Sequence, residues 1–192
     1  MEQETLFTSA KWNILKALAL EKKSPLELAE IANTSMSNIS QSLRFLEIAN
    51  IVKSERISNR DKGQPRVIYS LAKDNAYMIV TAEGFVEKKL IEIDEHKKTM
   101  IRIWLYPDQN KHNTLEQAYS ELKENIKNID AIYIEENTDL TLRIIYKDGK
   151  ENIPSTTNKT TYKKITPDEV KKTPEKYYTL YDPQKINTRI IT

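Results

Sequence analysis

The sequence predicts an α+β protein, because helical and strand-like patterns follow one another in two blocks. In the first block, apolar residues recur at helical spacing over residues 6–46, and two short runs rich in β-branched residues follow over 52–71. The second block repeats this order over residues 114–146. The chain has 192 residues, of which 39% are hydrophobic and 30% charged, so it is long enough for a core in each block.

Two helices are expected at the start of the first block. The first covers residues 6–20, and Thr8 or Ser9 can cap it by accepting hydrogen bonds from its free backbone amides. The second begins after Ser24, with proline at its first position and Glu27 at its third. Serine and glutamate at this spacing form a capping box, which marks a helix start well.

A third helix is expected after a break at Asn33, a residue suited to the left-handed conformation, with Ser35 as its N-cap. Its two faces differ in chemistry. The core-facing positions, at i, i+4 and i+7, are Ile39, Leu43 and Leu46. The positions at the same spacing on the opposite face are Ser37, Gln41 and Arg44, with Asn38 beside them.

The polar face of this third helix has the composition of a surface that contacts DNA. Gln and Asn can bond an adenine edge at two points, Arg can bond guanine, and serines bond phosphates. Residues 33–46 contain no Lys or Glu, although these are the usual residues of a solvated helix face. A helix that only packs on another surface is the alternative interpretation.

Two short strands are expected after this helix, over residues 52–57 and 66–71, with a polar turn between them. A hairpin that follows a helix-turn-helix is called a wing. Four residues at its tip could reach a minor groove or phosphates, namely Arg60, Lys62, Gln64 and Arg66. Residues 33–73 hold seven basic and three acidic side chains, as an interface with DNA would require. An ordinary solvated loop is the alternative.

Residues 6–73 resemble the winged-helix domain of ArsR-type and related archaeal transcription regulators. The resemblance is carried by Leu28-Ala29-Glu30, by the Ser, Ile and Leu positions of 35–46, and by Gly63-Gln-Pro-Arg-Val-Ile-Tyr-Ser-Leu71. It implies that a homodimer binds a palindrome, with the third helix in the major groove and the wing at the flanking minor groove. The DNA contacts implied are Ser35, Ser37, Asn38, Gln41, Arg44 and the wing tip.

Two departures from that family pattern are visible. Metal-sensing members place cysteines in the helix before the recognition helix, and this chain has no cysteine, so metal sensing at that site is excluded. Asn50 stands where the family usually has glycine, which asparagine can replace in a left-handed conformation.

The rest of the chain is divided into three expected parts after a first domain of residues 1–75. Residues 76–106 are a connector and an expected dimerisation helix, since apolar positions recur with heptad-like spacing from Val86 to Trp104. The competing interpretation makes 100–106 a strand. Residues 107–153 form a small α+β domain, with a helix opened by the capping box at 114–117 and strands at 131–135 and 140–146. Residues 154–192 are a basic, tyrosine-containing, partly ordered tail.

The composition argues against an enzyme. The chain has no cysteines, two histidines and three glycines, so we expect no metal site, no cofactor and no catalytic residues. Its start lacks the segments of a signal peptide and it has no run of about 18 apolar residues, so we expect a cytoplasmic protein with no membrane partner. The predicted function is a sequence-specific regulator that binds double-stranded DNA, with a possible effector at the C-terminal domain. A winged-helix module for protein interaction in a larger complex is the alternative.

Overall fold

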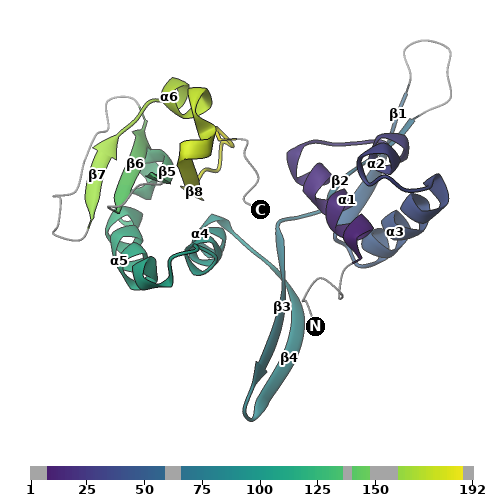
Figure 1. Cartoon of the computed structure of the whole chain (residues 1–192), viewed down its shortest axis with the longest axis horizontal. Coiled ribbons are helices and arrows are strands. Elements are labelled where there is room, and N and C mark those ends of the chain that lie inside the picture. Colours follow the sequence, from purple (N-terminus) through teal and green to yellow (C-terminus); the bar gives the residue numbers. More distant parts are fainter. Residues whose placement is uncertain (1–7, 59–65, 136–139, 148–159, 188–192) are drawn as a thin grey trace. The chain divides into compact units, whose positions relative to one another are not determined.

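The computed structural model describes residues 8–58, 66–135, 140–147 and 160–187. The chain is α+β and divides into two compact units, Met1–Glu92 and Ile93–Thr192. Figure 1 labels their elements. In the described part of the chain, no helix combines the length and the apolar character needed to span a membrane.

The first unit contains three helices followed by a hairpin. The helices are α1 (Ser9–Leu20), α2 (Pro25–Ile31) and α3 (Met36–Ile48), and the strands are β1 (Val52–Ile57) and β2 (Arg66–Leu71). The strands are antiparallel. All three helices and β1 contribute to one apolar core, whose fully buried members are Ile14, Leu28, Ile39 and Leu43. The predicted winged helix-turn-helix is confirmed.

Local signals set the helix starts in this unit. The capping box at Ser24 and Glu27 is formed, and Ser35 caps α3 by accepting from the backbone N–H of Asn38. Thr8 occupies the N-cap of α1, but its side chain makes no capping bond, so that part of the prediction was wrong. Asn33 and Asn50 adopt positive φ angles of 47° and 56°, as expected for asparagine at the end of a helix.

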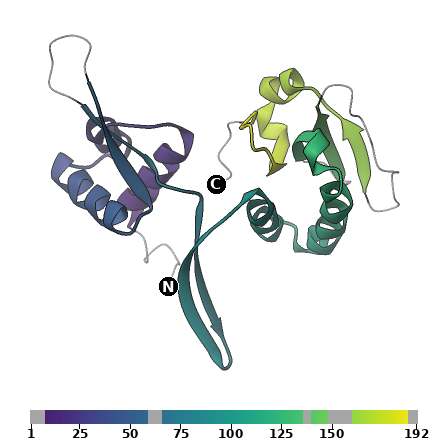
Figure 2. The same ribbon diagram turned by 180° about the vertical axis from the view of Figure 1, so that it is seen from behind.

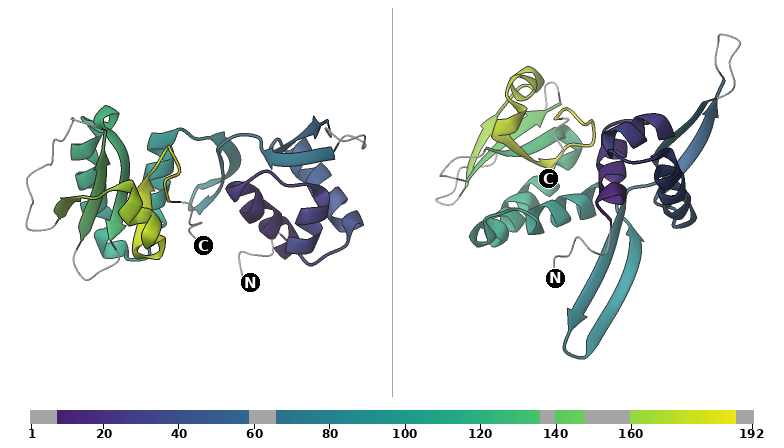
Figure 3. Two further views of the ribbon diagram at one scale, coloured as in Figure 1. Left: turned by 90° about the horizontal axis from the view of Figure 1, so that it is seen from above. Right: turned by 45° about the vertical axis from the view of Figure 1, so that its right-hand side comes forward.

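A second hairpin replaces the first half of the predicted dimerisation helix. Its strands are β3 (Asn75–Ala82) and β4 (Phe85–Glu92), which pair with each other in an antiparallel two-stranded sheet (Figure 3). Gly84 in the turn has a φ of 74°, which glycine adopts without strain. The single helix over 82–106 was therefore wrong, because β-branched residues and a glycine turn outweigh the apparent heptad spacing.

The second unit is built on a four-stranded sheet. Its helices are α4 (Glu95–Trp104), α5 (His112–Lys123) and α6 (Pro167–Lys172), with short 3-10 turns η2 (Gln109–Lys111), η3 (Ile126–Asn128) and η4 (Pro174–Lys176). Its strands are β5 (Ile129–Glu135), β6 (Thr141–Tyr146), β7 (Thr161–Lys164) and β8 (Tyr177–Tyr181). The strand order is β7-β6-β5-β8, and only the β6–β7 pair is parallel.

Helices cover both faces of this sheet. Ile132, Ile134 and Leu142 pack with residues of α4 and α5 on one face, while Ala131 and Tyr133 pack toward α6 on the other. Figures 1 and 2 show α4 and α5 together at one face of the sheet and α6 at the other.

Two sequence expectations for this unit need correction. The helix expected to open at the 114–117 capping box begins at His112 and ends at Lys123. Of the two interpretations of residues 100–106, the helix is correct for the part up to Trp104, where α4 ends. Residues 160–187, expected as part of a partly ordered tail, supply β7, α6 and β8. Tyr162, Tyr177 and Tyr178 are buried there, because strand pairing with β5 and β6 gives these aromatic rings a core to enter.

Candidate nucleic-acid interface

Helix α3 presents a polar face opposite its buried face. Ile39, Leu43 and Leu46 are at most 3% exposed and hold the helix against α1 and α2. The predicted contact residues on the other side are all exposed: Ser35, Ser37, Asn38, Gln41 and Arg44. The structure therefore places Ser37, Gln41 and Arg44 along one solvent-facing side of α3, with Asn38 beside them and Ser35 at the N-cap.

Two of these five residues already have local partners. The Ser35 hydroxyl accepts from the backbone N–H of Asn38 at 3.3 Å, and the Asn38 side-chain amide donates to the Thr34 hydroxyl at 3.1 Å. By contrast, Ser37, Gln41 and Arg44 form no side-chain hydrogen bond or ion pair with any residue of the described ranges. These three side chains are free to meet a ligand, whereas Ser35 and Asn38 shape the start of the helix.

The wing is only partly described. Arg60, Lys62 and Gln64 lie outside the described residues, so the structure does not place them. Arg66 is exposed, at the first position of β2 opposite Ile57.

The positive charge of Arg66 also acts on Glu27 at the start of α2. The pKa of Glu27 lies below its usual range, mainly because Ser24 donates hydrogen bonds to it, with smaller contributions from the positive charges of Lys23 and Arg66.

The wing is tied to the helices at several points. The Glu47 carboxylate, in the last turn of α3, accepts from the backbone N–H of Ser54 at 3.2 Å and from its hydroxyl at 2.6 Å. At the other strand, Lys23 and Tyr69 exchange two backbone hydrogen bonds of 3.1 and 2.8 Å. These bonds fix β1 to α3 and β2 to the loop between α1 and α2.

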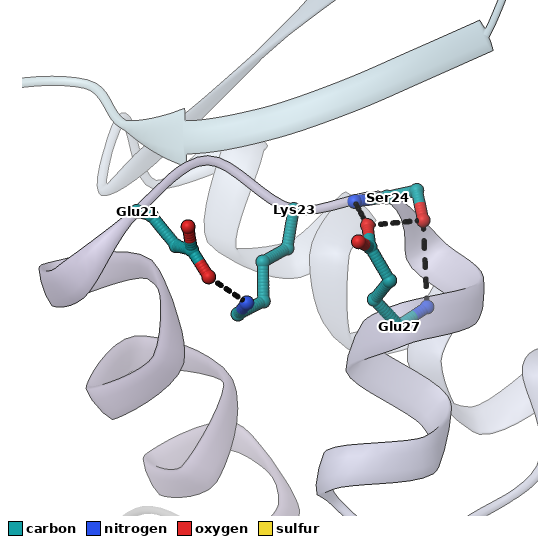
Figure 4. A network of polar contacts seen from close by, with 4 residues as sticks. All are labelled: Glu21, Lys23, Ser24 and Glu27. Carbon is teal, nitrogen blue, oxygen red and sulfur yellow. Dashed lines mark hydrogen bonds and ion pairs between the residues drawn. The ribbon is translucent and has the colours of Figure 1, made fainter.

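The Lys23 bridge lies next to the start of α2. Figure 4 shows the Lys23 ammonium paired with Glu21, and the reciprocal bonds between Ser24 and Glu27 that open α2. A further ion pair joins Lys22 to Glu55 on β1 at 2.7 Å. The loop between α1 and α2 thus anchors the wing through the Lys22 side chain and the Lys23 backbone, while the Lys23 ammonium pairs within the loop.

Arg56 is a candidate that the predicted site residues omit. Residues alternate between the two faces of a strand, and on β1 Val52 enters the core while Ser54 bonds Glu47. Arg56 is next on that same face and is exposed, so it lies on the α3 side of the wing. Arg66 pairs with Ile57 and lies on the opposite face. The alternation of strand residues between two faces, counted along the sequence from Val52, could have identified Arg56 as a candidate.

The second unit offers no comparable cluster in its described residues. Asp94 caps α4 by accepting from the backbone N–H of Lys97 at 2.8 Å, and the Glu95 carboxylate pairs with Lys98. The His96 imidazole stacks on Tyr119 with ring centroids 5.6 Å apart. Among the residues that the structure describes, no group of three or more His, Cys, Asp or Glu side chains is arranged to hold a metal ion.

The fold and the exposed polar face define the first unit as a winged helix-turn-helix, the class of domain found in DNA-binding transcription regulators. Residues 8–54 match the family described as bacterial regulatory protein, arsR family. Helices α1 to α3 therefore form an arsR-family helix-turn-helix domain. No curated protein matches the chain significantly.

Several solved structures are similar to parts of the chain. Wild-type Lactococcus lactis ZitR in complex with DNA is 18% identical, with 62% of this chain and 75% of that chain covered and a TM-score of 0.28. Pex from Synechococcus sp. is 25% identical, with a TM-score of 0.32. That match covers 34% of this chain and 64% of Pex, less than two thirds of its length. The circadian clock associated protein Pex from anabaena is 14% identical, with 67% and 100% covered and a TM-score of 0.30.

Proposed function

We propose that this chain is a sequence-specific transcription regulator that reads the major groove of double-stranded DNA with α3. The observation that carries the proposal is the row of Ser37, Gln41 and Arg44, exposed along one side of α3 directly opposite the buried Ile39 and Leu43. A helix anchored on one side by a core, with short polar side chains on the other, fits the width of the major groove.

Each polar residue has a role that follows from its chemistry. Gln41 is assigned to an adenine edge and Arg44 to a guanine edge, because their paired donors and acceptors match those bases. Ser35, Ser37 and Asn38 lie in or just before the first turn of α3, where backbone amides and the helix dipole attract a phosphate.

The wing is assigned to the DNA flanking the site bound by α3. Arg60, Lys62, Gln64 and Arg66 are proposed to contact the flanking groove or the phosphates there. Arg56, on the α3 side of the hairpin, joins this set as a phosphate contact. The regulator is proposed to act as a homodimer on a palindromic site, and the second unit is proposed to receive the signal that controls it.

Selection of bound duplexes from a random pool, using the full chain, tests this function. We expect one enriched palindromic sequence, and an affinity for it that falls as salt rises. Gln41→Ala and Arg44→Ala should each weaken binding to that sequence by about 1–3 kcal/mol, roughly 5- to 150-fold, and relax specificity at one base pair. Arg56→Ala should weaken binding to all duplexes about equally and reduce the salt slope by about 1.

Lys171→Ala is the matched control, because it removes a positive charge from an exposed position of α6 in the second unit. It should leave both affinity and specificity unchanged. Wild-type protein that selects no sequence, or Gln41 and Arg44 variants that bind like the wild type, would contradict the assignment. If Arg60→Glu with Lys62→Glu leaves the biological function intact, the winged helix is instead a protein-interaction module.

A further inference from the structure

The β3–β4 hairpin exposes several large apolar side chains. Met78 is 39% exposed, Ile79 47%, Phe85 51% and Val86 78%, and none of the residues of the two strands is buried. An isolated hairpin is marginally stable in water, and an uncovered apolar ribbon invites association. The hairpin therefore has the properties of an interaction surface.

The register assigns its residues to two faces, because residues that pair directly across an antiparallel hairpin lie on the same face. We call the first face the Met78 face. Its residues are Ala76, Met78, Val80, Ala82, Phe85, Glu87, Lys89 and Ile91. We call the other the Ile79 face. Its residues are Asn75, Tyr77, Ile79, Thr81, Val86, Lys88, Leu90 and Glu92.

The Met78 face is complementary to itself. Consider a second copy whose Met78 face packs against this one, related by a two-fold axis. The axis lies between the two faces, runs perpendicular to the strands, and sits at the level of the pair formed by Ile79 and Lys88. That operation sets Glu87 of each copy opposite Lys89 of the other, which makes two symmetric ion pairs. It also sets Met78 opposite Val80, and the remaining contacts join apolar side chains. A two-fold interface requires this kind of self-complementarity.

The Ile79 face does not have this property. The same operation applied there places Lys88 on the axis, opposite Lys88 of the other copy. Like charges placed directly opposite each other are destabilising, and here they would meet at the centre of the contact. Charge thus distinguishes the two faces, although both carry apolar residues.

We propose that the Met78 face of the hairpin docks on the same face of a second copy of this chain and forms the homodimer interface. The inference rests on the dimer that the proposed function requires, and it assigns that dimer to β3 and β4. A dimer held by this ribbon involves no helix, so it differs from the helical dimerisation segment expected from the sequence.

Charge reversal at the two complementary positions tests the interface, with sedimentation velocity of the full chain over micromolar concentrations as the measurement. Glu87→Lys and Lys89→Glu should each weaken dimerisation about tenfold or more, because each puts like charges opposite each other at two sites. The double variant with both changes should dimerise like the wild type. An equimolar mixture of the two single variants should form a heterodimer, because both ion pairs are then restored.

The mixture also shows that each single variant is folded, so loss of the dimer cannot be attributed to a damaged hairpin. Lys88→Glu on the Ile79 face is the matched control and should leave the dimer unchanged. A changed dimer affinity of Lys88→Glu, together with an unchanged Lys89→Glu, would overturn the proposal by placing the contact on the opposite face. Single variants that dimerise like the wild type would also overturn it.

Measuring without DNA keeps this test separate from the proposed function. If the protein selects a DNA sequence but the hairpin variants dimerise normally, only the interface is wrong. If the hairpin variants become monomeric but the wild type selects no DNA sequence, the interface stands and the DNA-binding proposal fails.

Discussion

Replacing Glu47 with alanine tests how firmly α3 is joined to the wing. The Glu47 carboxylate accepts from both the backbone N–H and the hydroxyl of Ser54, and these bonds span the turn that ends α3 and starts β1. Its negative charge also raises the pKa of Tyr69, after the larger effect of that phenol's burial. Glu47→Ala removes both bonds and leaves the Ser54 amide to water.

The size of the effect follows from two opposing contributions. Hydrogen bonds to a charged group stabilise by about 1.5–3 kcal/mol when buried, and the exposed position of Ser54 reduces the loss for the pair to about 1–2 kcal/mol. An acidic residue in the last turn of a helix opposes the helix dipole, so its removal returns about 0.3–1 kcal/mol. We expect the free energy of unfolding of the first unit to fall by about 1 kcal/mol, a loss of roughly 4–8 °C in Tm.

Tryptophan fluorescence can follow the first unit alone. Trp12 lies in α1 and Trp104 in α4, so a Trp104→Phe background leaves one reporter in the first unit. In urea unfolding, Glu47→Gln should be nearly as stable as the parent, because the amide oxygen still accepts and the repulsion with the dipole is gone. Ser54→Ala should lose about half as much as Glu47→Ala, because the backbone bond remains. If the parent and Glu47→Ala were equally stable, the Glu47–Ser54 bonds would not stabilise the first unit. If Glu47→Gln were no more stable than Glu47→Ala, the accepting oxygen would not be the cause of the effect. Either result would refute the prediction.

Two further predictions concern single residues. Asn50 has a φ of 56°, a backbone conformation that costs alanine more than asparagine or glycine. Asn50→Ala should therefore destabilise the first unit by about 1–2 kcal/mol, while Asn50→Gly should not. Thermal unfolding followed by Trp12 fluorescence would disprove this if the two variants were equally stable. Burial raises the pKa of Tyr178 to about 12, so the folded state favours the neutral phenol, and stability should fall as pH rises from about 10 through 12, by at most about 1.4 kcal/mol per pH unit for this residue. In urea unfolding followed at Trp104, Tyr178→Phe should show a smaller alkaline loss; an identical loss would contradict it.

The first unit follows from the sequence because its signals are local. The capping box at Ser24, the N-cap at Ser35 and the left-handed asparagines each depend on a few neighbouring residues, and all four features are in the structure. The exposed face of α3 follows in turn, since the buried positions at i, i+4 and i+7 determine which side chains remain outside. The DNA contacts proposed on that face remain predictions.

The errors fall where pairing between distant residues decides the structure. The heptad spacing from Val86 to Trp104 suggested one helix, yet the β-branched run before Gly84 pairs with 85–92 and makes a hairpin instead. Likewise, Tyr162 and Tyr177 looked like members of a basic tail, because their partners in β6 and β5 lie many residues away in the sequence. Composition alone could not show that these tyrosines have a sheet to join.

The strand order of the second unit has a consequence for how the protein folds as it is synthesised. Strand β5 lies inside the sheet only when β8, which begins at Tyr177, has paired with it. The first unit ends at Glu92 and is complete in sequence before the second, so its helices can begin to assemble while the second unit is still being translated. Until Tyr177–Tyr181 leaves the ribosome, β5 has one open edge, and an early stop before β8 would leave that edge of the sheet unpaired and prone to aggregation.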